Sequence, residues 1–75
     1  MIRYIPFEEQ LFLEEVGNYQ TFGICAYAQQ GDEWHEVRKI SDVSVELDFV
    51  AALCDKCNAG QLSPLHLLDA VEDAL

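Results

Sequence analysis

Two cysteines separated by two residues form the most recognisable chemical motif of the chain. Cys54-Asp55-Lys56-Cys57 matches C-x-x-C, which in redox proteins places a reactive thiolate at a helix N-terminus, where the macrodipole stabilises negative charge. Here the two cysteines lie near the C-terminal end of a predicted helix, on its apolar face. At that end the dipole opposes a thiolate. We therefore predict that Cys54 and Cys57 are small buried apolar residues.

A zinc site is the alternative that these cysteines leave open. Structural zinc needs four ligands in a tetrahedron, and Cys54, Cys57 and His66 supply three of the required type. Either Cys25 or His35 would be the fourth. A single C-x-x-C without a second pair of ligands is a weak pattern for such a site. The main prediction therefore includes no metal and no cofactor.

Acidic residues gather near the end of the second predicted helix. Asp69, Glu72 and Asp73 gather there, although the macrodipole disfavours negative charge near a helix C-terminus. Asp69 and Asp73 share a face with His66, at offsets of three and seven residues. Side chains on one exposed surface converge poorly for catalysis, and Ser63 is explained more simply as a helix cap. We expect no enzymatic activity. The charge either serves solubility or forms, with His66, a docking surface for a basic partner. Glu8, Glu9, Glu14 and Glu15 would join this surface if the fold brings them near.

The composition predicts one folded domain, residues 1–75, with an acidic surface. The chain has 14 Asp and Glu against 4 Lys and Arg, a net charge of -10, and 51% hydrophobic residues. That apolar content argues against a disordered acidic tail. Direct nucleic-acid binding is disfavoured because phosphate contacts need a basic footprint. The chain could instead occupy a nucleic-acid-binding surface as an acidic mimic.

The location predicted from the sequence is the cytoplasm. The first residues meet Pro6 and two glutamates almost at once, unlike a secretory signal. The longest uncharged stretch, Val16 to Gly31, contains Asn and Gln and falls short of the roughly 18 apolar residues of a membrane span. Three cysteines are an odd number, which fits free thiols in a reducing compartment. We expect no membrane contact and a monomer or a weak homodimer.

The first half of the chain has the pattern of a β-meander. Residues 11–16 and 19–28 are rich in β-branched and aromatic residues, and Gly17-Asn18 between them suits a type II′ hairpin turn. After a turn at 29–33, the polar stretch 34–40 predicts an exposed edge strand. Residues 1–9 could add another strand, although Pro6 limits how it pairs.

Two helices are predicted in the second half. Asp42 or Ser44 caps the first, with Glu46 and Asp48 in its opening turn, and residues 58–60 offer a left-handed stop. Its expected apolar stripe is Leu47, Val50, Ala51, Cys54 and Cys57. The second helix begins at Ser63-Pro64 and runs to the C-terminus, with an expected stripe of Leu65, Leu68, Val71 and Leu75.

These elements predict an α+β domain: a three-stranded, mostly antiparallel β-meander followed by two C-terminal helices packed on one face. The other sheet face or its edge stays available. The predicted function is a non-enzymatic protein-interaction or regulatory module that acts through its acidic helix. Trp34, Tyr4 or Tyr27 would add contacts where they are exposed.

Three segments carry a resemblance to a known family. Residues 19–24, 40–44 and 62–73 resemble, in order and spacing, a family of small uncharacterised proteins from Gram-positive anaerobic bacteria. The run from His66 to Asp73 is the most specific point of similarity. The resemblance implies no known activity. The cysteine pair is not part of the family pattern, which weakens any essential role for it.

Overall fold

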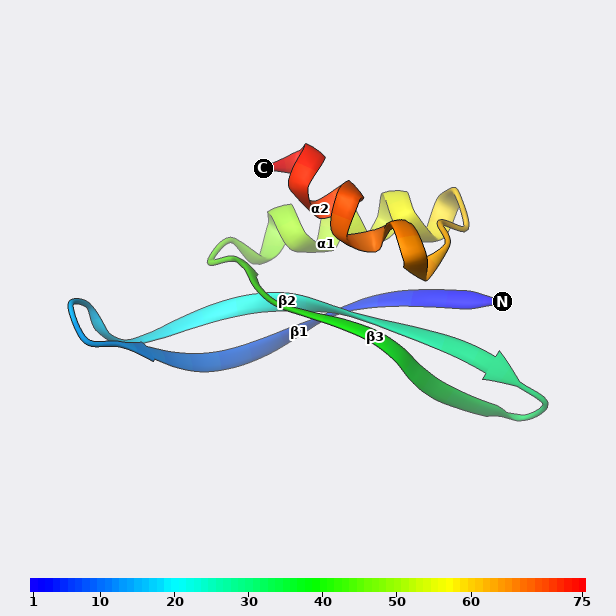
Figure 1. The fold of residues 1–75 in the computed structure, drawn as a ribbon, viewed down its shortest axis with the longest axis horizontal. Coiled ribbons are helices and arrows are strands. Elements are labelled where there is room, and N and C mark those ends of the chain that lie inside the picture. Colours follow the sequence, from blue (N-terminus) through cyan, green and yellow to red (C-terminus); the bar gives the residue numbers. More distant parts are fainter.

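The computed structural model describes residues 1–75 and places three antiparallel strands ahead of the helical segment (Figure 1). The strands are β1 (Ile2–Leu13), β2 (Gly17–Gln30) and β3 (Glu33–Ser44), in the order β1-β2-β3. Helix α1 (Leu47–Ala59) follows, then a 3₁₀ turn η1 (Pro64–His66) and helix α2 (Leu67–Ala74). The predicted α+β meander with two C-terminal helices is confirmed.

The core lies between the sheet and the helices, which occupy one side of it (Figure 1). Side chains alternate between the two faces of a strand, so Tyr4, Ile24 and Ala26 face the helices and are almost fully buried. The helices add Val50, Leu53, Cys54, Cys57, Leu67 and Val71 to the same cluster. The opposite face of the sheet has no layer covering it.

The first hairpin turns earlier than the Gly17-Asn18 pair predicts. Glu14, Glu15 and Val16 form the turn, in which the Val16 amide donates to the Leu13 carbonyl at 3.1 Å. Gly17 pairs with Leu13 at the start of β2, where its φ is 85°. The prediction of a two-residue turn was wrong because Gly17 provides the left-handed conformation after the turn rather than inside it.

Strand β1 joins two segments that the sequence treats separately. The stretch 1–9 and the start of 11–16 form one strand, paired with β2 in regular register from Ile2↔Ala28 to Leu13↔Gly17. Pro6 is accommodated because β1 is an edge strand. The sheet therefore keeps three strands.

The second hairpin and the third strand follow the prediction more closely. Gly31, with φ of 64°, and Asp32 connect Gln30 to Glu33. Strand β3 lies at the sheet edge as predicted, but it continues past Ile40 to Ser44. Its pairing with β2 is interrupted by two register shifts, characteristic of β-bulges.

Helix α1 begins and ends differently from the prediction. Asp42 is not its cap, because it lies in β3 with φ of 53°. Ser44 Oγ instead accepts from the Glu46 amide, and Glu46 is the N-cap residue. Leu47 is exposed because it opens the helix. At the other end Gly60 is right-handed, and Gln61 takes the left-handed conformation with φ of 47°.

Helix α2 presents a different apolar face from the one predicted. Leu67 and Val71 are buried, with Ala70 partly covered, whereas Leu65, Leu68 and Leu75 of the expected stripe are exposed. The 3₁₀ turn at Pro64–His66 advances about 120° per residue instead of 100°. This change rotates the residues that follow, so the predicted stripe was wrong at Leu65, Leu68 and Leu75 and right only at Val71. The Ser63 cap is confirmed, with Oγ accepting from the Leu65 amide.

The molecule is elongated, with extents of 44 × 25 × 19 Å. Both hairpins reach beyond the helices, one at each end of the sheet (Figure 1). No helix combines the length and apolar character required to cross a membrane.

Candidate functional site

The acidic helix face, which we define as Asp69, Glu72 and Asp73, lies on the solvent side of α2. These residues follow the i, i+3, i+4 spacing of one helix face, and all three are exposed. Leu67 and Val71 lie on the opposite face and anchor the helix in the core. Burial of the apolar side therefore fixes the direction in which the carboxylates point.

His66 lies at the N-terminal end of this face. It ends η1 and immediately precedes α2, and its side chain is exposed. No hydrogen bond or ion pair joins it to Asp69 or Asp73. The one histidine–carboxylate contact of the chain is between His35 Nε2 and Glu33 Oε2, at 3.4 Å. The structure thus places the four predicted docking residues on one helical segment, η1 and α2, without connecting them to each other.

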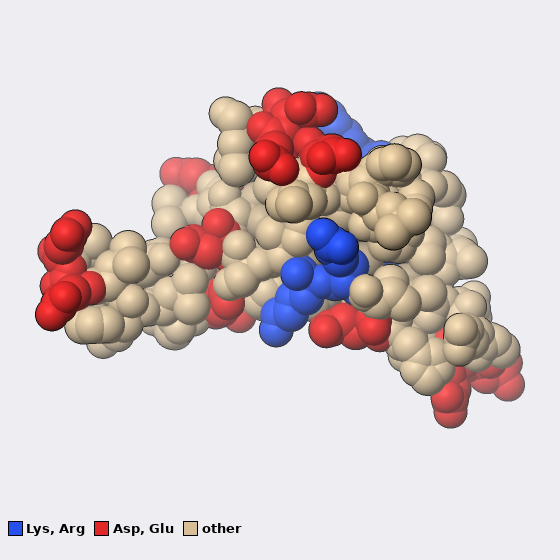
Figure 2. All heavy atoms as spheres, in the orientation of Figure 1, with Lys and Arg blue, Asp and Glu red and all other residues tan.

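None of the carboxylates forms an ion pair with Lys or Arg. Two of the cations lie instead over aromatic rings: Arg3 Cζ is 5.0 Å from the centre of the Trp34 ring, and Lys39 Nζ is 4.6 Å from that of Phe7. Figure 2 shows acidic atoms gathered over α2 and at the ends of both hairpins. The negative charge is thus presented to solvent without internal compensation.

The cysteines occupy the positions predicted for apolar residues. Cys54 and Cys57 are 2% and 5% exposed and belong to the core, and all three thiols are free. Burial raises the pKa of Cys54 to about 12, with smaller contributions from the negative charges of Cys57 and Asp55. Burial also raises the pKa of Cys57. Both thiols are therefore protonated at neutral pH.

The proposed zinc ligands do not converge. Cys54 and Cys57 face the core between α1 and the sheet, whereas His66 and His35 are exposed. Cys25 lies on the opposite sheet face, where its Sγ is 3.6 Å from Glu36 Oε1. No group of three or more His, Cys, Asp or Glu side chains is close enough to hold a metal ion. The residues present do not fit a tetrahedral site.

The aromatic residues considered as extra contacts have different surroundings. Tyr4 is 2% exposed, and its hydroxyl donates to the Leu62 carbonyl, so it is a core residue that fixes the segment after α1. Burial raises its pKa above 10.0. Trp34 is 37% exposed beneath Arg3, and Tyr27 is partly exposed. Only these last two could contact a partner.

A polar cluster around Asp42 was not anticipated from the sequence. Asp42 accepts hydrogen bonds from Tyr19 and Thr21 through its two carboxylate oxygens, at 2.9 and 2.7 Å. Glu9 accepts from the Asp42 amide and from Ser41 Oγ. These contacts join all three strands and hold the left-handed residue in place. A single Asp in a polar strand gives no sequence signal for such a cluster.

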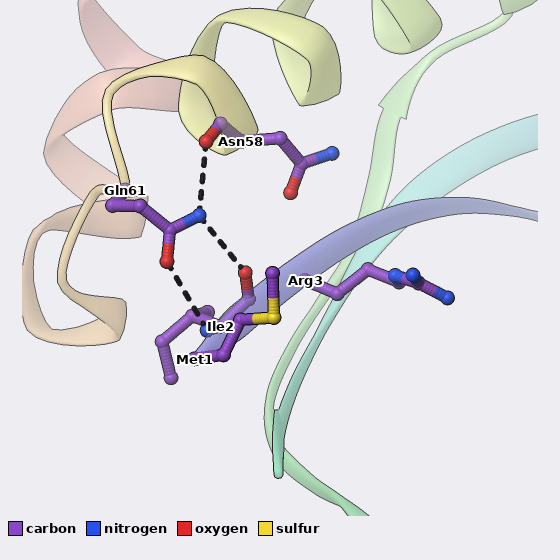
Figure 3. Close-up of a pocket in the computed structure, with 5 residues that line it drawn as sticks. All are labelled: Met1, Ile2, Arg3, Asn58 and Gln61. Carbon is purple, nitrogen blue, oxygen red and sulfur yellow. Dashed lines mark hydrogen bonds between the residues drawn. The ribbon is translucent and has the colours of Figure 1, made fainter.

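A second unanticipated group joins the end of α1 to β1. Asn58 accepts from the Tyr4 amide at 2.7 Å and donates to its carbonyl at 2.9 Å. Gln61 forms the same pair of bonds with Ile2 (Figure 3). A hollow of about 280 Å³ lies beside these bonds, lined by Met1, Ile2, Arg3, Asn58 and Gln61.

The only other hollow, of about 260 Å³, lies where α1 meets the segment leading to α2. Its lining is Leu53, Lys56, Cys57, Gly60, Leu62 and Ala70. Neither hollow brings a histidine and a carboxylate together.

These features define a small α+β domain with an uncompensated acidic surface. The chain belongs to the family described as a family of unknown function (DUF6514), whose model matches residues 2–75. The resemblance to a family of uncharacterised proteins is confirmed. No curated protein matches the chain, and no solved structure matches it.

Proposed function

We propose that the chain is a non-enzymatic interaction module that binds a basic protein partner through the acidic helix face, with His66 at its margin. One observation carries this proposal: Asp69, Glu72 and Asp73 are exposed on one side of α2, and no cation of the chain neutralises them. Glu72 and Asp73 also lie in the last turn of this eight-residue helix, near its negative end, whereas Asp69 lies in the first turn.

A cationic partner would remove an electrostatic cost that the free protein bears. The macrodipole disfavours Glu72 and Asp73 in the last turn of α2, and the three carboxylates repel one another. A lysine- or arginine-bearing surface placed over the face would offset both effects. It would also be attracted over distances of about 10 Å at moderate salt. Binding should therefore weaken as salt concentration rises.

We also propose where the protein acts and in which oligomeric state. Three free thiols suit a reducing cytoplasm, and the family resemblance supports an origin in Gram-positive anaerobic bacteria. We infer a monomer or a weak homodimer, because a charge of -10 opposes close association of two copies. Trp34 and Tyr27 would add contact area where a partner also reaches the open sheet face, on the side away from the helices.

The experiment is an affinity capture from native cell extract with two charge-matched variants. The first combines Asp69→Asn, Glu72→Gln and Asp73→Asn. The control combines Asp32→Asn, Glu33→Gln and Asp55→Asn, which are exposed residues outside α2. Both variants lose three negative charges, so a difference between them reports position and not net charge.

The expected result is loss of a salt-sensitive partner with the α2 variant and its retention with the control. Equal recovery with all three proteins would show that the acidic helix face is not the contact. Equal loss with both variants would show nonspecific attraction. If the partner binds nucleic acid and the nucleic acid displaces the chain, the acidic helix face acts as a nucleic-acid mimic.

A further inference from the structure

The outer edge of β1 divides into a closed half and an open half. In an antiparallel pair, the N–H and C=O of alternate residues point away from the partner strand. The register of β1 with β2 is regular, and the bonds of Ile2 and Tyr4 to side chains outside the sheet identify the outward set. That set is Ile2, Tyr4, Pro6, Glu8, Gln10 and Phe12.

The N-terminal half of this edge is closed by the chain itself. The amide groups of Asn58 and Gln61 each give one acceptor and one donor to β1, as the peptide groups of a neighbouring strand would. Figure 3 shows the Gln61 pair. Pro6 has no N–H to offer. Side-chain pairing and proline are both means of preventing further strand addition.

The C-terminal half of the edge is open. The outward backbone groups of Glu8, Gln10 and Phe12 have no hydrogen-bond partner in the chain. They lie in the half of β1 that leads to the β1–β2 turn, and this hairpin extends beyond the helices (Figure 1). They present a regular row of donors and acceptors, which is the geometry required for β-strand addition.

The edge of β3 offers no equivalent row. Its pairing with β2 shifts register twice, between Phe22 and Ile24 and between Ala26 and Tyr27. Asp42 has a left-handed conformation within it. Bulges of this kind twist an edge away from a regular incoming strand. The segment Glu8–Phe12 is therefore the best template for a fourth strand.

Charge indicates which strand would bind there. Glu8 lies in the segment and Glu14 and Glu15 at the nearby turn, and all three are exposed. Phe12 and Leu13 are 66% and 52% exposed beside them. A second copy of the chain would bring two such acidic turns together on molecules of charge -10 each. A basic segment with interspersed apolar residues complements both the charge and the apolar surface.

We propose that the edge from Glu8 to Phe12 binds an extended segment of a partner protein in which Lys or Arg alternates with an apolar residue. In an antiparallel arrangement the basic side chains lie on the helix side, next to Glu8 and Phe12. The apolar side chains lie on the open face, next to Leu11 and Leu13. This surface is separate from the acidic helix face, so each can be tested without the other.

The probe is a fluorescent peptide of about ten residues in which lysine and valine alternate. Two further peptides carry N-methyl groups on the lysine amides or on the valine amides. In the proposed arrangement only the lysine amides bond to β1, so their methylation should weaken binding about tenfold, whereas valine methylation should change it less than about twofold. Equal effects of the two methylations would overturn strand addition.

The matched protein variants are Gln10→Pro and Gln10→Thr. Proline removes an outward N–H, as Pro6 does naturally, and should weaken peptide binding about tenfold; threonine keeps the N–H and should retain binding. Amide exchange on the unaltered protein gives a second measurement, because the amides of Glu8, Gln10 and Phe12 should slow about tenfold when the peptide binds.

Three results would contradict the proposal. Unchanged exchange at Glu8, Gln10 and Phe12 with bound peptide would place the peptide elsewhere. Loss of peptide binding in the variant with Asp69→Asn, Glu72→Gln and Asp73→Asn would assign it to the acidic helix face. Dimerisation of the chain alone, abolished by Gln10→Pro, would identify a second copy as the occupant.

Discussion

Gly23 allows an aromatic ring to cover the middle of the open sheet face. A Cβ at position 23 would lie 2.6 Å from Cζ of Phe7 and would also overlap the Ile40 carbonyl oxygen. Phe7 pairs with Gly23 across the two strands, and Lys39 lies over its ring. The missing side chain of Gly23 is therefore the space in which Phe7 packs.

We predict that Gly23→Ala destabilises the fold by about 1–3 kcal/mol, since either the ring or the β3 backbone must move. Such a loss is large for a domain of this size, whose core gives roughly 3–5 kcal/mol. Urea unfolding measures it. Gly60→Ala is the control, because its nearest neighbouring atom is 3.5 Å away and its φ is -86°. Equal losses in both variants would show that Phe7 does not require the space at Gly23.

The buried thiol of Cys54 links stability to alkaline pH. Its pKa rises from 9.0 in the unfolded reference to about 12 in the folded protein, so the folded state binds more protons between these values. Stability from this group is complete below pH 9 and is lost as pH rises toward 12. Cys57 and Tyr4 change in the same direction.

We predict that the free energy of unfolding falls as pH increases from about 9 to about 11, and falls less steeply in Cys54→Ala. Urea titrations under reducing conditions provide the measurement. Val50→Ala shortens a neighbouring core residue without removing a titratable group. That control should be less stable at every pH and keep the original slope. An identical slope in Cys54→Ala would exclude this thiol as a source of the pH dependence.

At the scale of elements, one amide side chain adds a pair of hydrogen bonds to the apolar packing between α1 and β1. Asn58 satisfies both the N–H and the C=O of Tyr4, in a partly buried position. Gln61 does the same for Ile2, but in an exposed position and with a longer bond of 3.4 Å from the Ile2 amide. Water can replace Gln61 more easily than Asn58.

We predict that Asn58→Ala costs about 2 kcal/mol, because two partly buried backbone groups lose their partners. Gln61→Ala should cost less than about 1 kcal/mol, since water can reach Ile2. Urea unfolding measures both costs, and hydrogen exchange should show a faster Tyr4 amide in Asn58→Ala. If the two variants are equally stable, burial of the Tyr4 bonds contributes nothing.

The number and order of elements could be predicted from the sequence because they depend on local patterns. The β-branched and aromatic residues of 19–28 predicted a strand, and Ser63-Pro64 predicted a helix start. The buried face of α2 could not be predicted in the same way, because three residues of 3₁₀ geometry rotate Leu67 into the core in place of Leu68. Such a turn has no reliable sequence signal.

Some features of the candidate sites could likewise be predicted from local sequence patterns, and others could not. Exposure of Asp69, Glu72 and Asp73 follows from charge and helical spacing, and burial of Cys54 and Cys57 follows from their stripe. The half-open edge of β1 depends on contacts between residues more than 50 positions apart, such as Asn58 with Tyr4. Only the tertiary fold brings these residues together.

At the scale of the whole molecule, repulsion between like charges is not balanced by ion pairs. The net charge is -10, and no Lys or Arg lies within 4.0 Å of a carboxylate. Acidic atoms cluster over α2 and at both hairpin ends, as Figure 2 shows. Added salt therefore screens repulsion and has few attractive pairs to weaken.

We predict that the midpoint of thermal unfolding rises as NaCl increases from about 10 mM to about 0.3 M, over which the screening length falls from about 30 Å to less than 10 Å. The variant with Asp69→Asn, Glu72→Gln and Asp73→Asn has its charge reduced to -7, since three carboxylates are removed from a total of -10. It should be more stable at low salt and respond less to added NaCl. The control exchanges Asp and Glu at the same positions, which keeps the charge and should keep the full salt response. A midpoint that falls with salt would mean that attractive pairs, and not repulsion, dominate the electrostatics of the fold.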